Sequence, residues 1–225
     1  MLAFMLVGLL CLAMETPPVK ALPLTVRCGL RGEPTTVALQ PGWNLVSLPE
    51  RPVDPGLESI FSDPRDSTKM TTVTHVFSLQ GRRWVSARFD PASGTWDKGG
   101  GLTHIMDGWA YFILSSAEDA IRYNSTGYAP AITRQYRLLE GWNAIGVASE
   151  CGETIALASY LESVASKWTE ARMYVDGRFI SAFNGGTYRT ADNWSPKADG
   201  IPQVIAGRGY YVLLNADAVL GPFDY

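Results

Sequence analysis

Short runs in which apolar and polar side chains alternate recur along the chain. One run covers Trp43 to Leu48 and follows the turn-forming pair Pro41-Gly42. Two more runs, Val73 to Leu79 and Trp84 to Phe89, flank Gln80-Gly81-Arg82-Arg83 as two strands flank a hairpin turn. Alternation with a period of two residues is typical of strands that bury one face. The pattern therefore predicts a mainly β protein.

The second half of the chain contains similar runs. Met173-Tyr174-Val175 and Phe179 to Phe183 surround Asp176-Gly177-Arg178, which predicts a tighter hairpin. Trp109 to Leu114 and Tyr210 to Leu214 are largely apolar, which is typical of strands inside a sheet.

One segment has a helical period instead. Thr154 is a suitable N-cap for it, and the matching segment of the first half, Leu57 to Phe61, is shorter. Four apolar residues lie on one face of the predicted helix: Leu157, Leu161, Val164 and Trp168.

The two halves also match residue by residue. Gly141-Trp142-Asn143 follows Gly42-Trp43-Asn44 by 99 residues. Four more matches keep the same order, and their first residues lie 96 to 104 residues apart: Leu57 to Ile60 with Leu161 to Val164, Gly81 to Ala87 with Gly177 to Ala182, Tyr111 to Leu114 with Tyr211 to Leu214, and Asp119 to Ile121 with Asp217 to Val219. Five collinear matches indicate a duplication.

We therefore expect two tandem small antiparallel β modules, each with about five strands and one short helix. The first module spans residues 35–127 and the second spans residues 135–225, with residues 128–134 as a linker. Within each module, the Gly-Trp-Asn motif is expected to be structural. The glycine forms a turn, the tryptophan closes the end of a small core, and Asn44 or Asn143 bonds to nearby backbone.

The motif Gly-Trp-Asn-apolar-apolar-Ser at Gly42 to Ser47, with Gly-x-Gly-Tyr-Tyr-Val at Gly207 to Val212, resembles a known kind of repeated module. Such modules occur in secreted and surface-layer-associated proteins of bacteria and archaea. The resemblance covers most of residues 35–225, although Gly146 replaces the serine and Trp109-Ala110 stands in place of Gly209-Tyr210. It implies an extracellular accessory or envelope role and no established reaction, so no catalytic residue is transferred.

The first residues predict export. Met1 to Met14 form an unbroken apolar run that is too short to span a bilayer but fits the core of a secretory signal. No Lys or Arg precedes this run, so an uncleaved anchor is the alternative. We expect a signal peptide over residues 1–21, an N-terminal segment over residues 22–34, and a secreted or cell-surface protein without a transmembrane span in its mature form.

Two cysteines remain after the predicted signal. Export would permit a disulfide between Cys28 and Cys151, which would tie the two modules together. Two unpaired buried thiols are the alternative interpretation.

Charge and the chemistry-bearing residues narrow the choice of function. Only 18% of residues are charged and the net charge is -3, which argues against a nucleic-acid partner. The chain has two histidines, His75 and His104, and neither begins a metal-ligand spacing. We expect no enzyme and no cofactor. The remote alternative is a small hydrolase that uses His75, His104 or Asp97.

The loops suggest weaker candidate sites. Asp90 and Asp97 could offer oxygen ligands to calcium, although turn formation explains them equally well. Trp96, Tyr188 and Trp194 lie in or beside polar, glycine-rich segments and could stack on a ligand, or could instead close a small core. We therefore expect a non-catalytic interaction protein that binds an envelope protein or a glycan. The alternative is a carbohydrate-binding protein that uses these three loop aromatics.

Overall fold

The computed structural model describes residues 26–28, 33–62, 72–126, 135–147, 154–184, 187–190, 193–195 and 203–221. The expected signal peptide, the linker and Cys151 lie outside these residues. Within them the protein is mainly β, with several antiparallel sheets and only short helices. The prediction of a mainly β, antiparallel protein is therefore confirmed.

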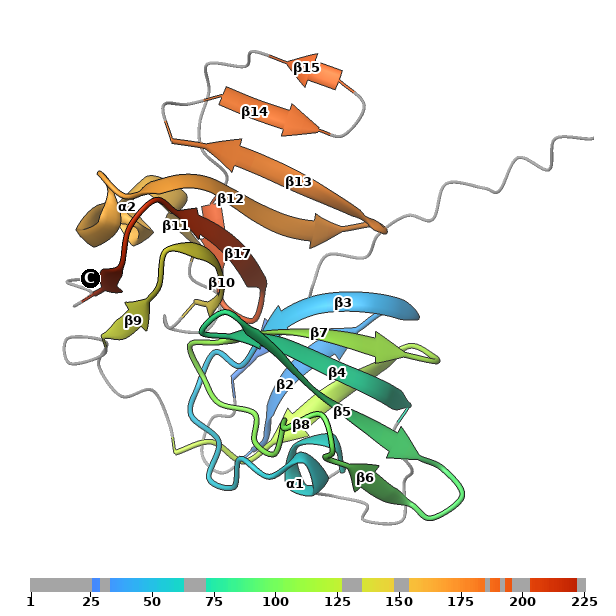
Figure 1. Ribbon diagram of the computed structural model, residues 1–225. Helices are drawn as coiled ribbons and strands as arrows, with labels where there is room; N and C mark the ends of the chain where they lie inside the picture. Colours follow the sequence, from blue (N-terminus) through green and yellow to red (C-terminus); the bar gives the residue numbers. More distant parts are fainter. Residues whose placement is uncertain are drawn as a thin grey trace, which may run out of the picture.

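The first half forms a five-stranded antiparallel sheet, drawn in blue to green in Figure 1. In sheet order, its strands are β3 (Gly42–Ser47), β7 (Ala110–Ser115), β4 (Val73–Gln80), β5 (Arg83–Asp90) and β6 (Thr95–Asp97). The predicted hairpin is β4–β5. The predicted apolar strand is β7, which pairs with both β3 and β4 and is therefore central.

The second half forms a six-stranded antiparallel sheet with the corresponding order. Its strands are β10 (Gly141–Gly146), β17 (Gly209–Leu214), β12 (Trp168–Val175), β13 (Arg178–Phe183), β14 (Thr187–Thr190) and β15 (Asn193–Ser195). Here the hairpin is β12–β13 and the central apolar strand is β17.

Further short strands raise the number of strands above the expected five in each half. They are β1 (Val26–Arg27), β2 (Thr35–Leu39) and β8 (Asp119–Tyr123) in one sheet, β9 (Tyr136–Leu138) with β18 (Ala218–Leu220), and β11 (Thr154–Ala156) with β16 (Gln203–Ile205). Strands of two to five residues show too few alternations to be recognised in a sequence.

The helix of the second half is shorter than predicted. Thr154 belongs to strand β11 rather than to an N-cap, and Trp168 begins β12. Between them the chain forms α2 (Leu157–Tyr160) and the 3-10 turn η2 (Glu162–Val164). In the first half, α1 (Leu57–Phe61) lies where the sequence predicted a short helix.

Each half has its own hydrophobic core, and a third apolar cluster lies between the halves. In the central strands, Tyr111 and Ile113 face the first core, and Tyr210 and Val212 face the second. Residues on the opposite faces of the strands form the third cluster: Leu45, Leu79, Ala110, Ala144 and Tyr211. Both faces of the central strands are therefore buried, which explains why these strands read as continuous apolar runs.

Strand register corrects four of the five sequence matches. Trp43 pairs with Leu114 and Trp142 pairs with Leu213, so Tyr111 corresponds to Tyr210 rather than to Tyr211. Trp109 therefore corresponds to Arg208, and Ala110 to Gly209. The tyrosine hydroxyls support this register, because Met106 N–H donates to Tyr111 Oη at 2.8 Å and Ile205 N–H donates to Tyr210 Oη at 3.0 Å.

The other three corrections follow in the same way. Leu39 pairs with Asp119 and Leu138 pairs with Ala218, so Asp119 corresponds to Ala218 rather than to Asp217. The two hairpins correspond at an offset of 95 residues, since Ala87 pairs with Val76 and Ala182 pairs with Ala171. Helix α1 corresponds to α2, since Gly56 bridges His104 just before Leu57 and Ala156 pairs with Gln203 just before Leu157.

The Gly-Trp-Asn match holds without any shift. Asn44 Oδ1 accepts from Gln40 N–H at 2.9 Å, and Asn44 Nδ2 donates to the carbonyls of Gln40 and Gly42 at 2.8 and 2.9 Å. Asn143 makes the same three bonds, with Leu139 N–H at 3.0 Å and with the carbonyls of Leu139 and Gly141 at 2.7 and 3.0 Å. Gly42 and Gly141 have φ of 93° and 96°, which favours glycine.

The two signature tryptophans do not close the ends of the cores. Trp43 is 37% exposed and lies on Phe112, with ring centres 4.8 Å apart and planes 4° apart. Trp142 packs against the third cluster, between the halves. Both rings point away from their own core because residue positions in a strand alternate between its two faces.

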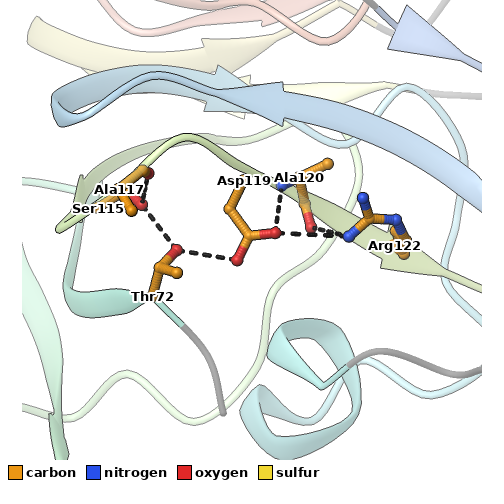
Figure 2. Close-up of polar contacts among 6 residues, drawn as sticks. All are labelled: Thr72, Ser115, Ala117, Asp119, Ala120 and Arg122. Carbon is orange, nitrogen blue, oxygen red and sulfur yellow. Dashed lines mark hydrogen bonds and ion pairs between the residues drawn. The ribbon is translucent and has the colours of Figure 1, made fainter. Parts of the chain in front are cut away.

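A polar network anchors the start of β4 to the turn between β7 and β8 (Figure 2). Thr72 Oγ1 lies 2.8 Å from Ser115 Oγ and donates to Asp119 Oδ2 at 2.9 Å. Asp119 Oδ1 accepts from Ala120 N–H at 2.8 Å and lies 3.4 Å from Arg122 Nη1. These bonds join the start of β4, the end of β7 and the start of β8. They give the polar side chains at this end of the sheet hydrogen-bond partners.

Candidate binding groove between the two sheets

An open groove of about 700 Å³ lies between the two halves, and we call it the inter-sheet groove. The first half contributes Leu79, Arg82, Trp84 and Phe112, and the second half contributes Glu140, Gly141, Trp142, Arg172, Phe179 and Tyr211. The volume lies within the range of roughly 300–1,000 Å³ that is usual for small-molecule sites.

Aromatic rings from both halves form the walls of the groove. Trp84 on β5 is 57% exposed and meets Tyr211 edge-on, with ring centres 6.0 Å apart. Phe179 on β13 is 38% exposed and lies 6.0 Å from Tyr211 and 6.3 Å from Phe112. Large rings held this far out of a core offer apolar faces to a ligand.

The polar groups of the groove lie next to these rings. Arg172 places its guanidinium carbon 4.5 Å from the centre of the Trp142 ring, and its Nε donates to Glu170 Oε1 at 2.7 Å. Within the described residues, the two terminal nitrogens of Arg172 have no hydrogen-bond partner. Arg82 of the first half lies 3.7 Å from Glu140 of the second, in an exposed ion pair that adds little stability.

The corresponding positions on the other side of the interface are different. The register places Phe77 where the second half has Arg172, because these residues pair with Phe112 and Tyr211 respectively. Phe77 lies 5.8 Å from Trp43, which itself stacks on Phe112. One side is thus filled by an aromatic stack, whereas an arginine occupies the matching position in the groove.

Burial in the groove also affects an ionisable group. Burial raises the pKa of Tyr211 well above its usual value of 10.0, so its hydroxyl is neutral at physiological pH. A neutral phenol can both donate and accept a hydrogen bond.

The three aromatic residues that the sequence suggested do not form this site. Trp96 lies on β6 and is only 8% exposed, with its ring between Phe61 and Phe89 at 5.0 and 5.4 Å. It is a core residue, so the prediction of ligand binding is wrong for Trp96. Tyr188 lies on β14 and Trp194 on β15, in strands rather than loops, and their side chains lie outside the described part of the structure.

The two calcium candidates serve their own turns. Asp90 accepts from Ala92 N–H at 3.0 Å and from Ser93 Oγ at 2.8 Å, and these hydrogen bonds lower the pKa of its carboxyl. Asp97 accepts from Gly99 N–H at 2.9 Å. No group of three or more His, Cys, Asp or Glu side chains in the described ranges could hold a metal ion.

The histidines are likewise bonded locally. His75 Nδ1 lies 3.0 Å from Thr74 Oγ1, and its ring stacks on Phe77. His104 Nδ1 lies 2.8 Å from Thr103 Oγ1. Neither histidine hydrogen-bonds to a carboxylate of the described residues, and neither lines the groove.

Sequence reasoning missed the groove because its residues come from five segments that lie far apart in the sequence. One signal was present, however. Leu45, Ala110 and Phe112 are apolar on the face of each strand opposite to the first core. A second apolar face on a strand indicates a second packing partner.

Cys28 is disulfide-bonded, and its expected partner Cys151 lies outside the described residues. Among the helices that the structure describes, none is both long enough and apolar enough to cross a membrane. No protein-family model, curated protein or solved structure matches the chain.

Proposed function

We propose that this protein is a non-catalytic extracellular binding protein and that the inter-sheet groove holds a carbohydrate. The observation that supports this most is the combination of exposed rings with nearby charged groups in one groove. One face of a pyranose ring presents polarised C–H groups that fit the negative face of an aromatic ring. The hydroxyl groups at its edge fit the donors and acceptors of Arg82, Arg172 and Glu140.

The size of the groove favours a glycan over a protein partner. A stable protein interface buries roughly 800 Å² on each partner and is usually flatter. A groove of about 700 Å³ fits a short oligosaccharide segment better. An envelope protein is the second candidate partner. It would bind to a larger area of the protein surface than this groove.

The charged groups favour binding over hydrolysis. A glycosidase needs two carboxyl groups roughly 5–10 Å apart. Among the described residues that line the groove, only Glu140 has a carboxylate. This supports a role in binding without chemistry.

The extracellular location is part of the same proposal. The apolar run at Met1 to Met14 fits a secretory signal. A disulfide at Cys28 is in keeping with an oxidising compartment.

The test is retention of the full chain on insoluble glycans and on an array of soluble oligosaccharides. Trp84→Ala should weaken binding at least about tenfold, since loss of a central aromatic anchor costs roughly 2 kcal/mol or more. Trp43→Phe is the control, because Trp43 is also partly exposed and does not line the groove, and a phenylalanine keeps a ring on Phe112. Binding should change less than about threefold in this control. Failure of the parent protein to bind any glycan, or equal loss in both variants, would refute the proposal.

A further inference from the structure

The two halves contact each other through a reciprocal pair of backbone hydrogen bonds. Ser47 N–H on β3 donates to Gly207 O at 2.9 Å. Gly146 N–H on β10 donates to Gly108 O, also at 2.9 Å. Because Gly146 corresponds to Ser47 and Gly108 corresponds to Gly207, exchanging the halves turns one bond into the other.

The neighbouring bridges obey the same exchange. Val46 forms an antiparallel bridge with Arg208, and Ile145 forms one with Trp109. Ile145 corresponds to Val46 and Trp109 to Arg208, so this pair is also reciprocal. An interface is isologous when every contact between two residues is repeated between the two corresponding residues with the halves exchanged. A two-fold dimer has such an interface.

Two pairs of corresponding residues face each other where the two-fold axis must pass. A Cβ placed on Gly146 would lie 2.5 Å from Ser47 Cβ, and one placed on Gly209 would lie 2.6 Å from Ala110 Cβ. Each pair thus has a side chain on one half and a glycine on the other. Neither glycine has a positive φ, so crowding across the interface, not backbone conformation, excludes a side chain there.

This asymmetry has a physical reason. In an exact two-fold dimer, two serines or two alanines would face each other across the axis. Their Cβ atoms would then be closer together than the van der Waals contact distance. Reduction of one member of each pair to glycine removes the clash while the other member fills the space. Ser47 uses its position further, since its hydroxyl donates to Arg208 O at 2.9 Å.

We infer that the two halves are joined as an internal two-fold dimer. The surface of each half around Ser47 and Ala110, or around Gly146 and Gly209, is a self-complementary interface. The partner that it fits is a second unit of the same fold, and in this chain that partner is the other half. The edge strands β3 and β10 each make one bridge to the other half, at their C-terminal ends.

The test exchanges the axial residues within the full chain. Gly146→Ser alone should lower the melting temperature by about 4–10 °C, because it overpacks the axis. The double variant Ser47→Gly/Gly146→Ser should recover part of this loss, because the contact with Ser47 Cβ is removed while a Cβ at position 146 still lies 2.9 Å from Trp109 O. It restores one side chain and one glycine at the axis, and the new hydroxyl can donate to Trp109 O as Ser47 donates to Arg208 O. Ala110→Gly/Gly209→Ala is an independent exchange, for which we expect a melting temperature within about 3 °C of the parent.

Each outcome decides the inference. Recovery in the Ser47/Gly146 exchange, together with a parent-like melting temperature in the Ala110/Gly209 exchange, supports a two-fold interface, whatever ligand the groove binds. A double variant that is no more stable than Gly146→Ser, or that fails to fold, would overturn it. So would a Gly146→Ser variant as stable as the parent protein.

Discussion

Arg172 lies over Trp142, with its guanidinium carbon 4.5 Å from the ring centre, whereas the corresponding position beside Trp43 is held by Phe77. The neighbouring pair differs as well, since Glu170 binds Arg172 where His75 stacks on Phe77. Two related halves therefore present one aromatic stack and one charged groove. This difference makes Arg172 the residue that distinguishes the groove from its counterpart.

Replacing Arg172 with phenylalanine should convert the groove toward the aromatic stack of the other side. Glycan affinity should fall at least about tenfold, because the guanidinium donors are lost and an added ring fills space. The melting temperature should also fall, by about 4–10 °C, because Glu170 is only 8% exposed and loses its ion-pair partner. Isothermal titration calorimetry and a thermal scan measure both effects. Arg172→Lys is the control and should retain part of the affinity, and unchanged affinity in Arg172→Phe would contradict the site.

The two signature asparagines should contribute equally to stability. Asn44→Ala or Asn143→Ala removes three hydrogen bonds to the backbone at a buried turn, so each should lower the free energy of unfolding by about 2–3 kcal/mol. Urea unfolding measures the change. Asn124→Ala, at an exposed position, should change it by less than about 0.5 kcal/mol. A loss below about 1 kcal/mol in either turn variant would show that these bonds do not hold the motif together.

Stability should fall at alkaline pH. Burial raises the pKa of Tyr111, Tyr123, Tyr210 and Tyr211 above the ordinary value of 10.0. Above pH 10 the unfolded chain loses these protons while the folded chain keeps them, so the stabilisation present below pH 10 is progressively lost. Each such tyrosine adds a slope of up to about 1.4 kcal/mol per pH unit.

Tyr211→Phe isolates one of these groups, because desolvation is the cause of its shift. The variant should unfold with a shallower dependence on pH between pH 9 and 11 than the parent, as followed by urea midpoints. Identical slopes for parent and variant would mean that Tyr211 ionises equally readily in both states.

Much of the fold followed from local patterns. The period-two runs located both hairpins, and the continuous apolar runs located both central strands. The helix of the second half was overestimated because Thr154 to Ala156 pair with β16, a long-range contact that no local pattern records. The sequence matches were displaced by one residue near Tyr210, since adjacent tyrosines look alike until strand register separates them.

The candidate site was harder to predict. Trp96 looked available because it lies near glycine-rich loops, yet Phe61 and Phe89 enclose it. Trp142 was expected to be structural and Trp84 was assigned only to a strand, yet both line a groove because the outer faces of the two sheets come together. A site formed at an interface between halves depends on their relative placement, which residue spacing does not contain.

The most direct test of the carbohydrate site is a titration that reports each tryptophan separately. The chain has seven tryptophans, and single substitutions can assign the NMR signal of each indole N–H. An oligosaccharide that the protein binds is then added stepwise, and the signals are followed. We predict that the signals of Trp84 and Trp142 shift, while those of Trp43 and Trp96 stay in place. Shifts confined to other tryptophans, with Trp84 and Trp142 unmoved, would contradict a binding site between the two sheets.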